Sequence, residues 1–302
     1  MKYKMLETIL DIDENLINKL GLADESEFEL LGKVSVLKIN EDIEGQYNIV
    51  SGDRLTFDGS KVTFYDKNLD RELVRNHFYI VLFLLHLIIN AEKGIVSLHA
   101  SAIQMGNKVI LFLGPKESGK STTALALNRG GYPFVANDYI ELLLENGGTK
   151  VINVDLKESI SFRKHSAYQL GILEYGSVRK SVNEIYKLPI KMLNYQDNYK
   201  EIVLCLPHLK NDHPLEVYEL DGLEKKMNLF QQVSYFYRNI AVLMLEKGRL
   251  SNDMIPDELL INTTIHAELD CLFKKLNEST VFEFYGSPED IANYLIEKSR
   301  EE

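Results

Sequence analysis

Glycine, lysine and hydroxyl side chains occur at fixed spacing in the stretch from Val109 to Thr123. An apolar run is followed there by GPKESGKS, which fits the pattern G-x-x-x-x-G-K-[ST]. Gly114 and Gly119 let the backbone curl so that consecutive N–H groups face inward toward an anion. A chance match is the alternative, but a strand is expected before the loop and a helix after it. The pattern therefore predicts a loop that binds nucleotide phosphates.

The end of this loop supplies charge and a metal ligand. Lys120 is expected to offer a mobile cation to the β- and γ-phosphates, and Ser121 to offer its hydroxyl to Mg²⁺. The helix that begins near Lys120 directs its positive end toward the same phosphates. No separate role is assigned to the side chains of Lys116 and Glu117, which are expected to be solvated. The residues assigned to nucleotide binding are Gly114, Pro115, Lys116, Glu117, Ser118, Gly119, Lys120, Ser121 and Thr122.

An aspartate follows the next predicted strand, 134–136. Asp138 lies 18 residues after Lys120. At the end of a buried strand, a carboxylate can hold Mg²⁺ or accept a proton from an attacking hydroxyl. The alternative is that Asp138 only caps the turn into Tyr139. Glu141 is expected on the opposite face of its strand, which makes it a weaker candidate.

A histidine precedes the loop. His99 lies in the apolar segment 95–103, for which one continuous strand is predicted, and Ala100, Ser101 and Ala102 follow it. By itself such a histidine is most simply a hydrogen-bonded core residue. The three small residues would allow a ligand to approach the backbone closely.

In this order, the three features resemble the catalytic domain of HPr serine kinase/phosphorylase and its relatives. The resemblance covers residues 94–166, about a quarter of the chain. It implies that Lys120 and Ser121 bind phosphate and Mg²⁺. It also implies that Asp138 is the general base toward a protein serine, or a metal ligand, and that His99 lies beside the transferring phosphate. The matching segments are His99-Ala100-Ser101-Ala102, Gly114 to Thr122 and Val135-Ala136-Asn137-Asp138.

The chain departs from the family pattern at position 137. The family has an acidic pair where this chain has Asn137-Asp138, so Asp138 must serve as both base and metal ligand or recruit Glu141, Asp155 or Glu158. The family's C-terminal loop signature for contact with HPr is not found, and the N-terminal region has no match. The resemblance therefore implies a relative of HPr kinase, similar to kinases encoded beside ribosomally made, modified peptides.

The elements around these residues predict an α/β fold in two domains. Short strands, including 34–39 and 61–65, and a long apolar helix over 70–92 predict a small β-rich N-terminal domain over 1–93. Alternating strands and helices predict a P-loop nucleotide-binding core of the HPr kinase C-terminal type over 94–302. Further strands are expected at 109–113, 134–136, 140–145, 202–206, 215–220 and 280–285, with helices at 120–128, 223–247, 258–276 and after Ser287.

Composition excludes several classes of protein. The 302 residues include 34 Lys and Arg against 45 Asp and Glu, a net charge of −11, which argues against a nucleic-acid partner. Hydrophobic residues form 45% of the chain, which is too many for a disordered protein. The two cysteines, Cys205 and Cys271, are interpreted as reduced core residues, so a disulfide scaffold is excluded.

No segment is expected to cross a membrane or to direct export. The apolar run over 78–89 has twelve residues, which is too short for a bilayer and predicts a buried helix. Residues 1–7 lack the sustained apolar stretch of a secretory signal. We therefore expect a cytoplasmic protein with no membrane partner, where ATP is available.

The function expected from these features is that of an ATP- and Mg²⁺-dependent kinase. It would transfer the γ-phosphate to a serine hydroxyl of a small protein or peptide, with Asp138, His99 and Lys120 as catalytic residues and Ser121 and Asp138 as metal ligands. The N-terminal domain would bind the polypeptide or a partner, and a homo-oligomer is left open. Two alternatives remain: a nucleotide-binding regulatory module without phosphotransfer, and a small-molecule kinase.

Overall fold

The structure is a computed structural model of the 302-residue chain, which divides into two units. The first unit contains Met1–Gly94 and Ser234–Asp270, and the second contains Ile95–Val233 and Cys271–Glu302. The break after Gly94 lies at the boundary expected from the sequence, whereas the grouping of Ser234–Asp270 with the first unit was not expected. The described residues are 1–30, 33–41, 43–53, 56–65, 71–115, 117–145, 148–154, 159–163, 177–179, 185–189, 197–210, 212–235, 273–274 and 276–301.

The first unit contains a seven-stranded sheet in the order β3-β4-β1-β2-β5-β7-β6. Alternating apolar residues bury one face of its strands, as in β2, where Thr8, Leu10 and Ile12 are buried. The strands expected at 34–39 and 61–65 are confirmed as β4 and β7. The strands are β1 (Lys2–Met5), β2 (Thr8–Ile12), β3 (Glu27–Leu30), β4 (Val34–Ile39), β5 (Tyr47–Gly52), β6 (Thr56–Asp58) and β7 (Lys61–Tyr65).

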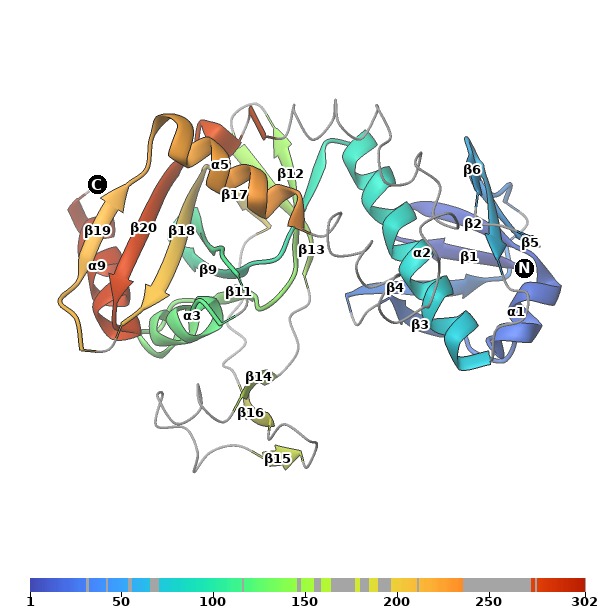
Figure 1. Cartoon of the computed structure of the whole chain (residues 1–302), viewed down its shortest axis with the longest axis horizontal. Helices are drawn as coiled ribbons and strands as arrows, with labels where there is room; N and C mark the ends of the chain where they lie inside the picture. The colour runs from blue at the N-terminus through green and yellow to red at the C-terminus, as the bar shows by residue number, and fades with distance from the viewer. Residues whose placement is uncertain are drawn as a thin grey trace. The chain divides into compact units, whose positions relative to one another are not determined.

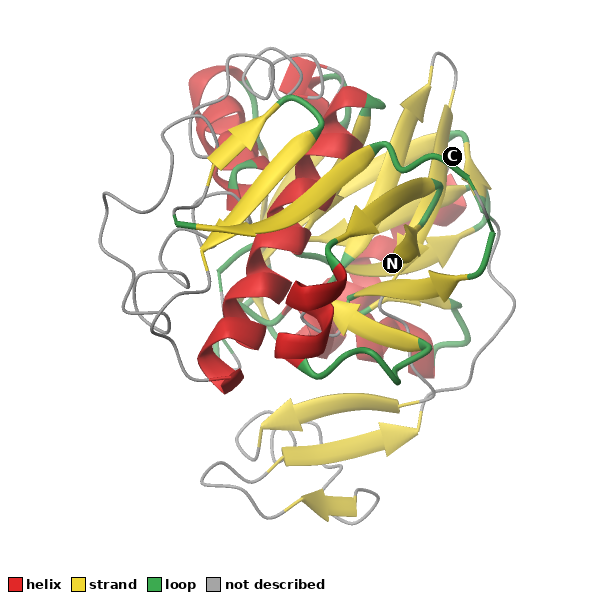
Figure 2. Ribbon diagram, turned by 90° about the vertical axis from the view of Figure 1, so that its right-hand side faces the viewer, coloured by secondary structure: helices red, strands yellow, loops and turns green. Residues whose placement is uncertain are grey.

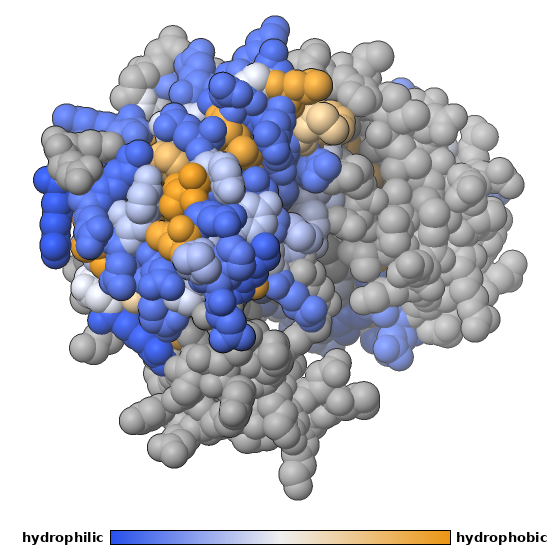
Figure 3. Space-filling view, turned by 60° about the vertical axis from the view of Figure 1, so that its left-hand side comes forward, coloured by the Kyte–Doolittle hydropathy of each residue, from blue (hydrophilic) through white to orange (hydrophobic). Residues whose placement is uncertain are grey.

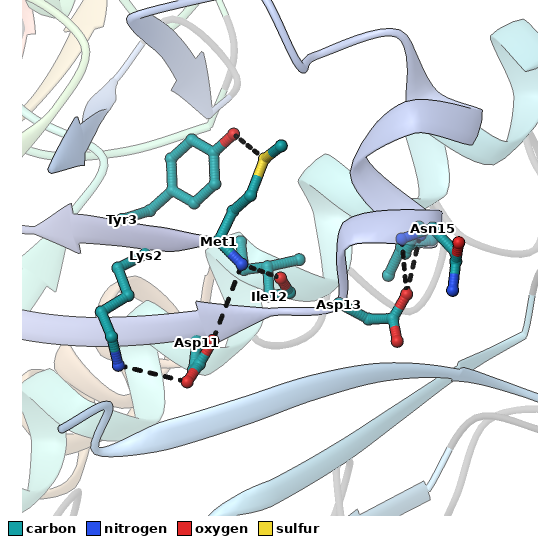
Figure 4. Close-up of polar contacts among 8 residues, drawn as sticks. Met1, Lys2, Tyr3, Asp11, Ile12, Asp13 and Asn15 are labelled. Atoms are coloured by element: carbon teal, nitrogen blue, oxygen red, sulfur yellow. Dashed lines mark hydrogen bonds and ion pairs between the residues drawn. The ribbon is translucent and has the colours of Figure 1, made fainter. Parts of the chain in front are cut away.

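A short helix, α1 (Glu14–Leu20), follows β2 directly. Its start is fixed by Asp13, whose carboxylate accepts hydrogen bonds from the backbone N–H groups of Asn15 at 2.7 Å and Leu16 at 3.1 Å (Figure 4). Gly21 ends the helix at φ +70°, a conformation that favours glycine. Local sequence therefore fixes both ends of this element.

The long apolar helix α2 (Arg71–Glu92) lies across one face of this sheet (Figure 1). Phe78 packs edge-on against Phe64 of β7, with ring centroids 5.7 Å apart. The stretch Val74–Glu92 is long and apolar enough to cross a membrane, but 83% of its 18-residue window is buried inside the protein. The expected burial of the run over 78–89 is confirmed. The helix extends beyond that run, so length alone does not exclude a membrane span.

His77 of α2 gives this unit a pH-dependent stability. Its ring is 1% exposed, neither ring nitrogen has a hydrogen-bond partner in the part of the chain that the structure describes, and burial lowers its pKa from 6.5. Below pH 6.5 the unfolded chain therefore binds a proton at this histidine that the folded chain does not. The free energy of unfolding then falls by at most about 1.4 kcal/mol for each unit by which the pH is lowered. We predict that His77→Phe loses less stability than the wild type between pH 7 and pH 5, measured by urea unfolding. Equal pH dependence in the two proteins would contradict the prediction.

The second unit is built on a six-stranded sheet in the order β11-β9-β10-β18-β20-β19. β10, β18 and β20 are parallel, and β9 is antiparallel to both β10 and β11. The strands expected at 109–113, 134–136, 202–206, 215–220 and 280–285 are all confirmed in this sheet. Its strands are β9 (Ser101–Met105), β10 (Lys108–Phe112), β11 (Phe134–Ala136), β18 (Glu201–Leu209), β19 (Glu216–Glu219) and β20 (Thr280–Gly286).

Two helices cover one face of this sheet (Figure 1). They are α3 (Lys120–Arg129) and α9 (Pro288–Glu301), and their buried side chains join those of the strands in one core. Ser287 starts α9 as expected, because its hydroxyl accepts from the Asp290 N–H at 3.1 Å. Cys205 of β18 lies in this core as a free, fully buried thiol, and burial raises its pKa well above the usual range.

A four-stranded sheet, β17-β13-β12-β8, also belongs to this unit. The helix α5 (Gly222–Val233) contacts its edge strand β8. A three-stranded sheet, β14-β16-β15, completes the described strands (Figure 2). The bounds are β8 (Ile95–Leu98), β12 (Ile140–Glu145), β13 (Gly148–Val154), β17 (Asn198–Tyr199), β14 (Ser159–Arg163), β15 (Ser177–Arg179) and β16 (Ile185–Pro189).

One strand prediction was wrong. The segment 95–103 is not a continuous strand, because the chain leaves β8 at Leu98 and enters β9 at Ser101. β8 pairs with β12 in one sheet, whereas β9 pairs with β10 in the other. The backbone therefore changes its hydrogen-bonding partners at His99 and Ala100.

The later part of the helix expected at 223–247, and all but the end of the helix expected at 258–276, lie outside the described residues.

The chain is thus a mixed α/β protein with several sheets, as the coarse fold prediction stated. Its described helices are α1, α2, α3, α5 and α9. On the face drawn in Figure 3, hydrophilic residues cover most of the described surface and hydrophobic residues form small separate areas.

Candidate functional site

The loop that joins β10 to α3 lies at the edge of the six-stranded sheet where the parallel strands end. β9 begins at this same edge, because Ser101 is paired with Phe112, the last residue of β10. β11 ends there as well, because Ala136 is paired with Ala102. The sheet therefore brings the start of β9, the loop and the residues after β11 to one place, although they are far apart in sequence.

The loop backbone is strongly curled. Gly114 and Gly119 have φ +137° and +105°, and Glu117 has φ +70°, which is rare for a residue with a side chain. A Cβ atom on Gly114 would lie 2.8 Å from Ser118 Oγ, and one on Gly119 only 2.3 Å from Leu209 Cγ. Both predicted glycines are therefore required by conformation and by space. Lys116 lies outside the described residues.

Lys120 is folded back onto the loop. Its side chain is 5% exposed, and Nζ donates to the carbonyl oxygens of Gly114 and Pro115 at 2.9 Å each. Burial lowers its pKa to about 8, and the negative charge of Asp138 acts in the opposite direction. The amine is therefore still mainly protonated at pH 7. A mobile cation was expected at this position, whereas the Lys120 amine is buried and bonded to the loop.

Other polar groups of the loop are aimed inward. The Gly114 N–H donates to Oε1 of Gln232, a 7% exposed residue of α5, at 3.2 Å. That N–H is therefore occupied by protein and does not face an open anion site. Ser118 Oγ is buried and has no hydrogen-bond partner among the described residues. An unpartnered buried hydroxyl at the centre of the loop fits a site that a phosphate oxygen would complete.

Asp138 and His99 face each other across this edge. Asp138 follows β11 and is 52% exposed, and its Oδ1 lies 3.8 Å from His99 Nε2. The His99 side chain is 15% exposed, in the connection between β8 and β9. The Ser101 hydroxyl contacts both Ser121, the residue after Lys120, and the carbonyl of Asn137, the residue before Asp138, so this carboxylate and the loop amine belong to the same region, and the charge of Asp138 acts on the pKa of Lys120. The structure therefore brings His99, Lys120 and Asp138 together.

Ser121 is tied to the same edge through Ser101. The two hydroxyl oxygens lie 3.0 Å apart, and Ser101 Oγ also donates to the backbone carbonyl of Asn137. Asn137 directly precedes Asp138, so one buried hydroxyl connects the first turn of α3 with the turn that carries the aspartate. Thr122 is buried behind them in α3.

Glu141 is not part of this group. It is fully buried in β12 and accepts a hydrogen bond from the Tyr139 hydroxyl, whose oxygen also lies 3.4 Å from Ser97 Oγ. The expectation that Glu141 is a weaker candidate than Asp138 agrees with this arrangement. Asp155 and Glu158 lie outside the described residues.

The residues at the loop fit a magnesium ion that is shared with a nucleotide. Mg²⁺ in phosphoryl-transfer sites takes one or two protein oxygens, several waters and the substrate's phosphates. Ser121 and Asp138 offer a hydroxyl and a carboxylate of this type. The described residues contain no group of three His, Cys, Asp or Glu side chains that could hold a metal by themselves. A hydroxyl and a carboxylate suit a cation whose other ligands are waters and phosphate oxygens.

Three residues of this site were missed in the sequence analysis. Ser101 was noted only as a small residue. Leu209 packs against Gly119, and the side chain of Gln232 accepts a hydrogen bond from Gly114, which lies 118 positions earlier in the chain. Local patterns carry no signal for the last two contacts, because they depend on how β18 and α5 pack.

Comparison with known proteins adds no family assignment. No protein-family model matches the sequence, and a search of curated proteins gives no match.

Proposed function

We propose that the chain is an ATP- and Mg²⁺-dependent kinase that transfers the γ-phosphate to a serine hydroxyl of a small protein or peptide. The observation that carries the proposal is the convergence of a curled glycine loop, a buried protonated lysine and a half-exposed aspartate at one sheet edge. The loop and lysine suit a triphosphate, and the aspartate suits the hydroxyl that attacks it.

The proposed chemistry assigns a task to each group and two tasks to Asp138. The loop and the start of α3 bind the phosphate oxygens, and Lys120 neutralises their charge. Asp138 accepts the proton of the serine hydroxyl, while the serine oxygen forms a bond to the γ-phosphorus and the bond to the ADP oxygen breaks. Ser121 and Asp138 would hold Mg²⁺, which supplies further charge neutralisation on the β- and γ-phosphates.

His99 supports Asp138 in this proposal. With Nε2 3.8 Å from Oδ1, the imidazole can limit the directions in which the carboxylate points. The resemblance of the three motifs to HPr kinase likewise implies that His99 lies beside the transferring phosphate. In this proposal the core expected over residues 94–302 belongs to the P-loop class of nucleotide-binding folds, although the resemblance itself covers only 94–166.

The remaining assignments follow from this function. The β-rich unit, 1–93, would bind the polypeptide substrate or a partner protein. The protein would act in the cytoplasm, where ATP is available, and would need neither a nucleic acid nor a membrane.

A second candidate function is a nucleotide-binding regulatory module without phosphotransfer. Asn137 favours it, because the resemblance expects a second acid at this position and a side-chain amide can neither accept the proton as a carboxylate does nor supply its negative charge. In such a module ATP would bind and the protein would respond to it without turnover. An Asn137→Asp variant that gains transfer from near zero would support this second function.

The test uses γ-³²P-ATP, Mg²⁺ and three acceptors: a degenerate peptide library with a central serine, the same library with alanine, and a pool of small alcohols including glycerol and free serine. The proposal expects label in the serine library that is lost in Lys120→Ala and Asp138→Asn. Label confined to the small-alcohol pool indicates a small-molecule kinase. ATP binding without label in any acceptor supports the regulatory module and rejects the kinase.

A further inference from the structure

Ser101 occupies an unusual position for a residue with no predicted role. It is fully buried, at the first position of β9, and its hydroxyl contacts two groups of the proposed site. One contact is Ser121 Oγ at 3.0 Å, and the other is the backbone carbonyl of Asn137. Residues from β9, from α3 and from the turn after β11 therefore meet at one oxygen atom.

The chemistry of the two contacts fixes the direction of both hydrogen bonds. A carbonyl oxygen can only accept, so Ser101 uses its one hydroxyl proton to reach Asn137. Ser101 then has no proton left for Ser121, and the proton between the two hydroxyls comes from Ser121. Ser101 thus accepts from Ser121 and donates to Asn137.

This direction matters for the oxygen of Ser121. A serine hydroxyl ligates Mg²⁺ through an oxygen lone pair and must direct its proton elsewhere. With that proton held by Ser101, the lone pairs of Ser121 remain for a cation. The bond to Asn137 also restrains the backbone directly before Asp138, the second proposed ligand.

From this geometry we infer that Ser101 is a positioning residue for magnesium: one buried hydroxyl that orients Ser121 and anchors the turn carrying Asp138. The inference rests on the proposed function, because it concerns the metal of that same site. It goes beyond it by naming a residue that touches neither nucleotide nor metal. Groups of this kind behind metal ligands typically change metal affinity by about 10- to 100-fold when they are removed.

A purely structural role makes a different prediction. If Ser101 only joins β9 to α3, its removal lowers stability and weakens all ATP binding alike. If it positions the metal ligands, its removal weakens only the part of ATP binding that depends on Mg²⁺. Titration calorimetry of the full chain with ATP in EDTA and with ATP plus Mg²⁺ separates the two roles.

For Ser101→Ala we expect an ATP affinity in EDTA within about threefold of wild type. The factor by which Mg²⁺ increases the ATP affinity should fall by about 10-fold or more. The matched control is Ser97→Ala, another buried serine, which lies in β8 and whose Oγ is 3.4 Å from the Tyr139 hydroxyl oxygen. It should keep the full magnesium effect. Circular dichroism confirms that each variant is folded.

A double-mutant cycle keeps the inference testable if Ser101→Ala is partly destabilised. In a Ser121→Ala background, Ser101→Ala should cause a smaller loss of the magnesium effect than in wild type, because the hydroxyl that it orients is gone and only its bond to the turn before Asp138 remains. Equal, additive losses in both backgrounds would overturn the inference.

Its failure is distinguishable from failure of the proposed function. Wild-type protein that binds no ATP, or binds it without any magnesium effect, contradicts the proposed function. Wild-type protein with a clear magnesium effect that Ser101→Ala retains in full contradicts the role of Ser101 alone.

Discussion

Asp138→Asn should lower transfer of phosphate to a serine peptide by about 10²- to 10⁴-fold, the usual contribution of a general base. The amide keeps the size of the carboxylate but cannot accept the proton of the attacking hydroxyl. Affinity for ATP in EDTA should stay equal or rise, because a negative charge near Lys120 and the phosphates is removed. Single-turnover transfer from γ-³²P-ATP and calorimetry measure the two quantities.

The control for this variant is Asp58→Asn, an exposed aspartate at the end of β6 in the other unit. It should leave both quantities unchanged. Transfer by Asp138→Asn at the wild-type rate would remove Asp138 from the chemistry. Loss of ATP binding in EDTA together with loss of transfer would point to a folding defect in place of a catalytic one.

Lys120→Ala should lower ATP affinity by about 100-fold, which corresponds to about 2.7 kcal/mol. The removed group is a buried, protonated amine, and hydrogen bonds to charged groups contribute about 1.5–3 kcal/mol each. The variant also leaves the carbonyl oxygens of Gly114 and Pro115 without this donor, so the loop itself is expected to loosen. Calorimetric titration with ATP gives the affinity.

Lys108→Ala is the matched control, because Lys108 begins β10, the strand that leads into the loop, and so lies at the opposite end of that strand. There it forms an ion pair with Glu201 at 3.0 Å. ATP affinity should be unaffected by its removal. A folded Lys120→Ala protein that binds ATP as tightly as wild type contradicts the phosphate-binding role of the loop.

Much of the secondary structure could be predicted, because its signals are local. The long helix is confirmed as Arg71–Glu92, and the helix after the loop is confirmed as Lys120–Arg129. Helix starts such as Ser287 were readable because capping depends on neighbouring residues. Apolar runs bounded by turn residues located the strands of the central sheet.

Sheet membership could not be predicted in the same way. The segment 95–103 reads as one apolar strand, yet its two halves belong to different sheets. The second half pairs with β10 through the turn at Gly106 and Asn107, whereas the first half pairs with β12, which lies beyond α3 and β11 in the chain, and that remote pairing decides where the break falls. Strand pairing is a long-range property, and no local pattern near His99 records it.

In the candidate site, too, the residues in local motifs could be predicted and the contacts from remote elements could not. Motif spacing identified Lys120, Ser121 and Asp138, and the fold places the first and last of these near each other. Gln232 and Leu209 could not be identified, because their contacts with the loop arise from packing of remote elements. The role inferred for Ser101 depends on hydrogen-bond direction, which only atomic positions reveal.

The proposed function requires ATP to bind with its phosphates at the loop that joins β10 to α3. A titration of isotopically labelled wild-type protein with ATP, followed by backbone amide chemical shifts, tests this binding. Binding at the loop should give saturable shifts that are largest at Ser118, Gly119, Lys120 and Ser121 and that disappear in Lys120→Ala. Shifts that cluster in another part of the chain while these amides stay unchanged, or no shifts at millimolar ATP, would contradict it.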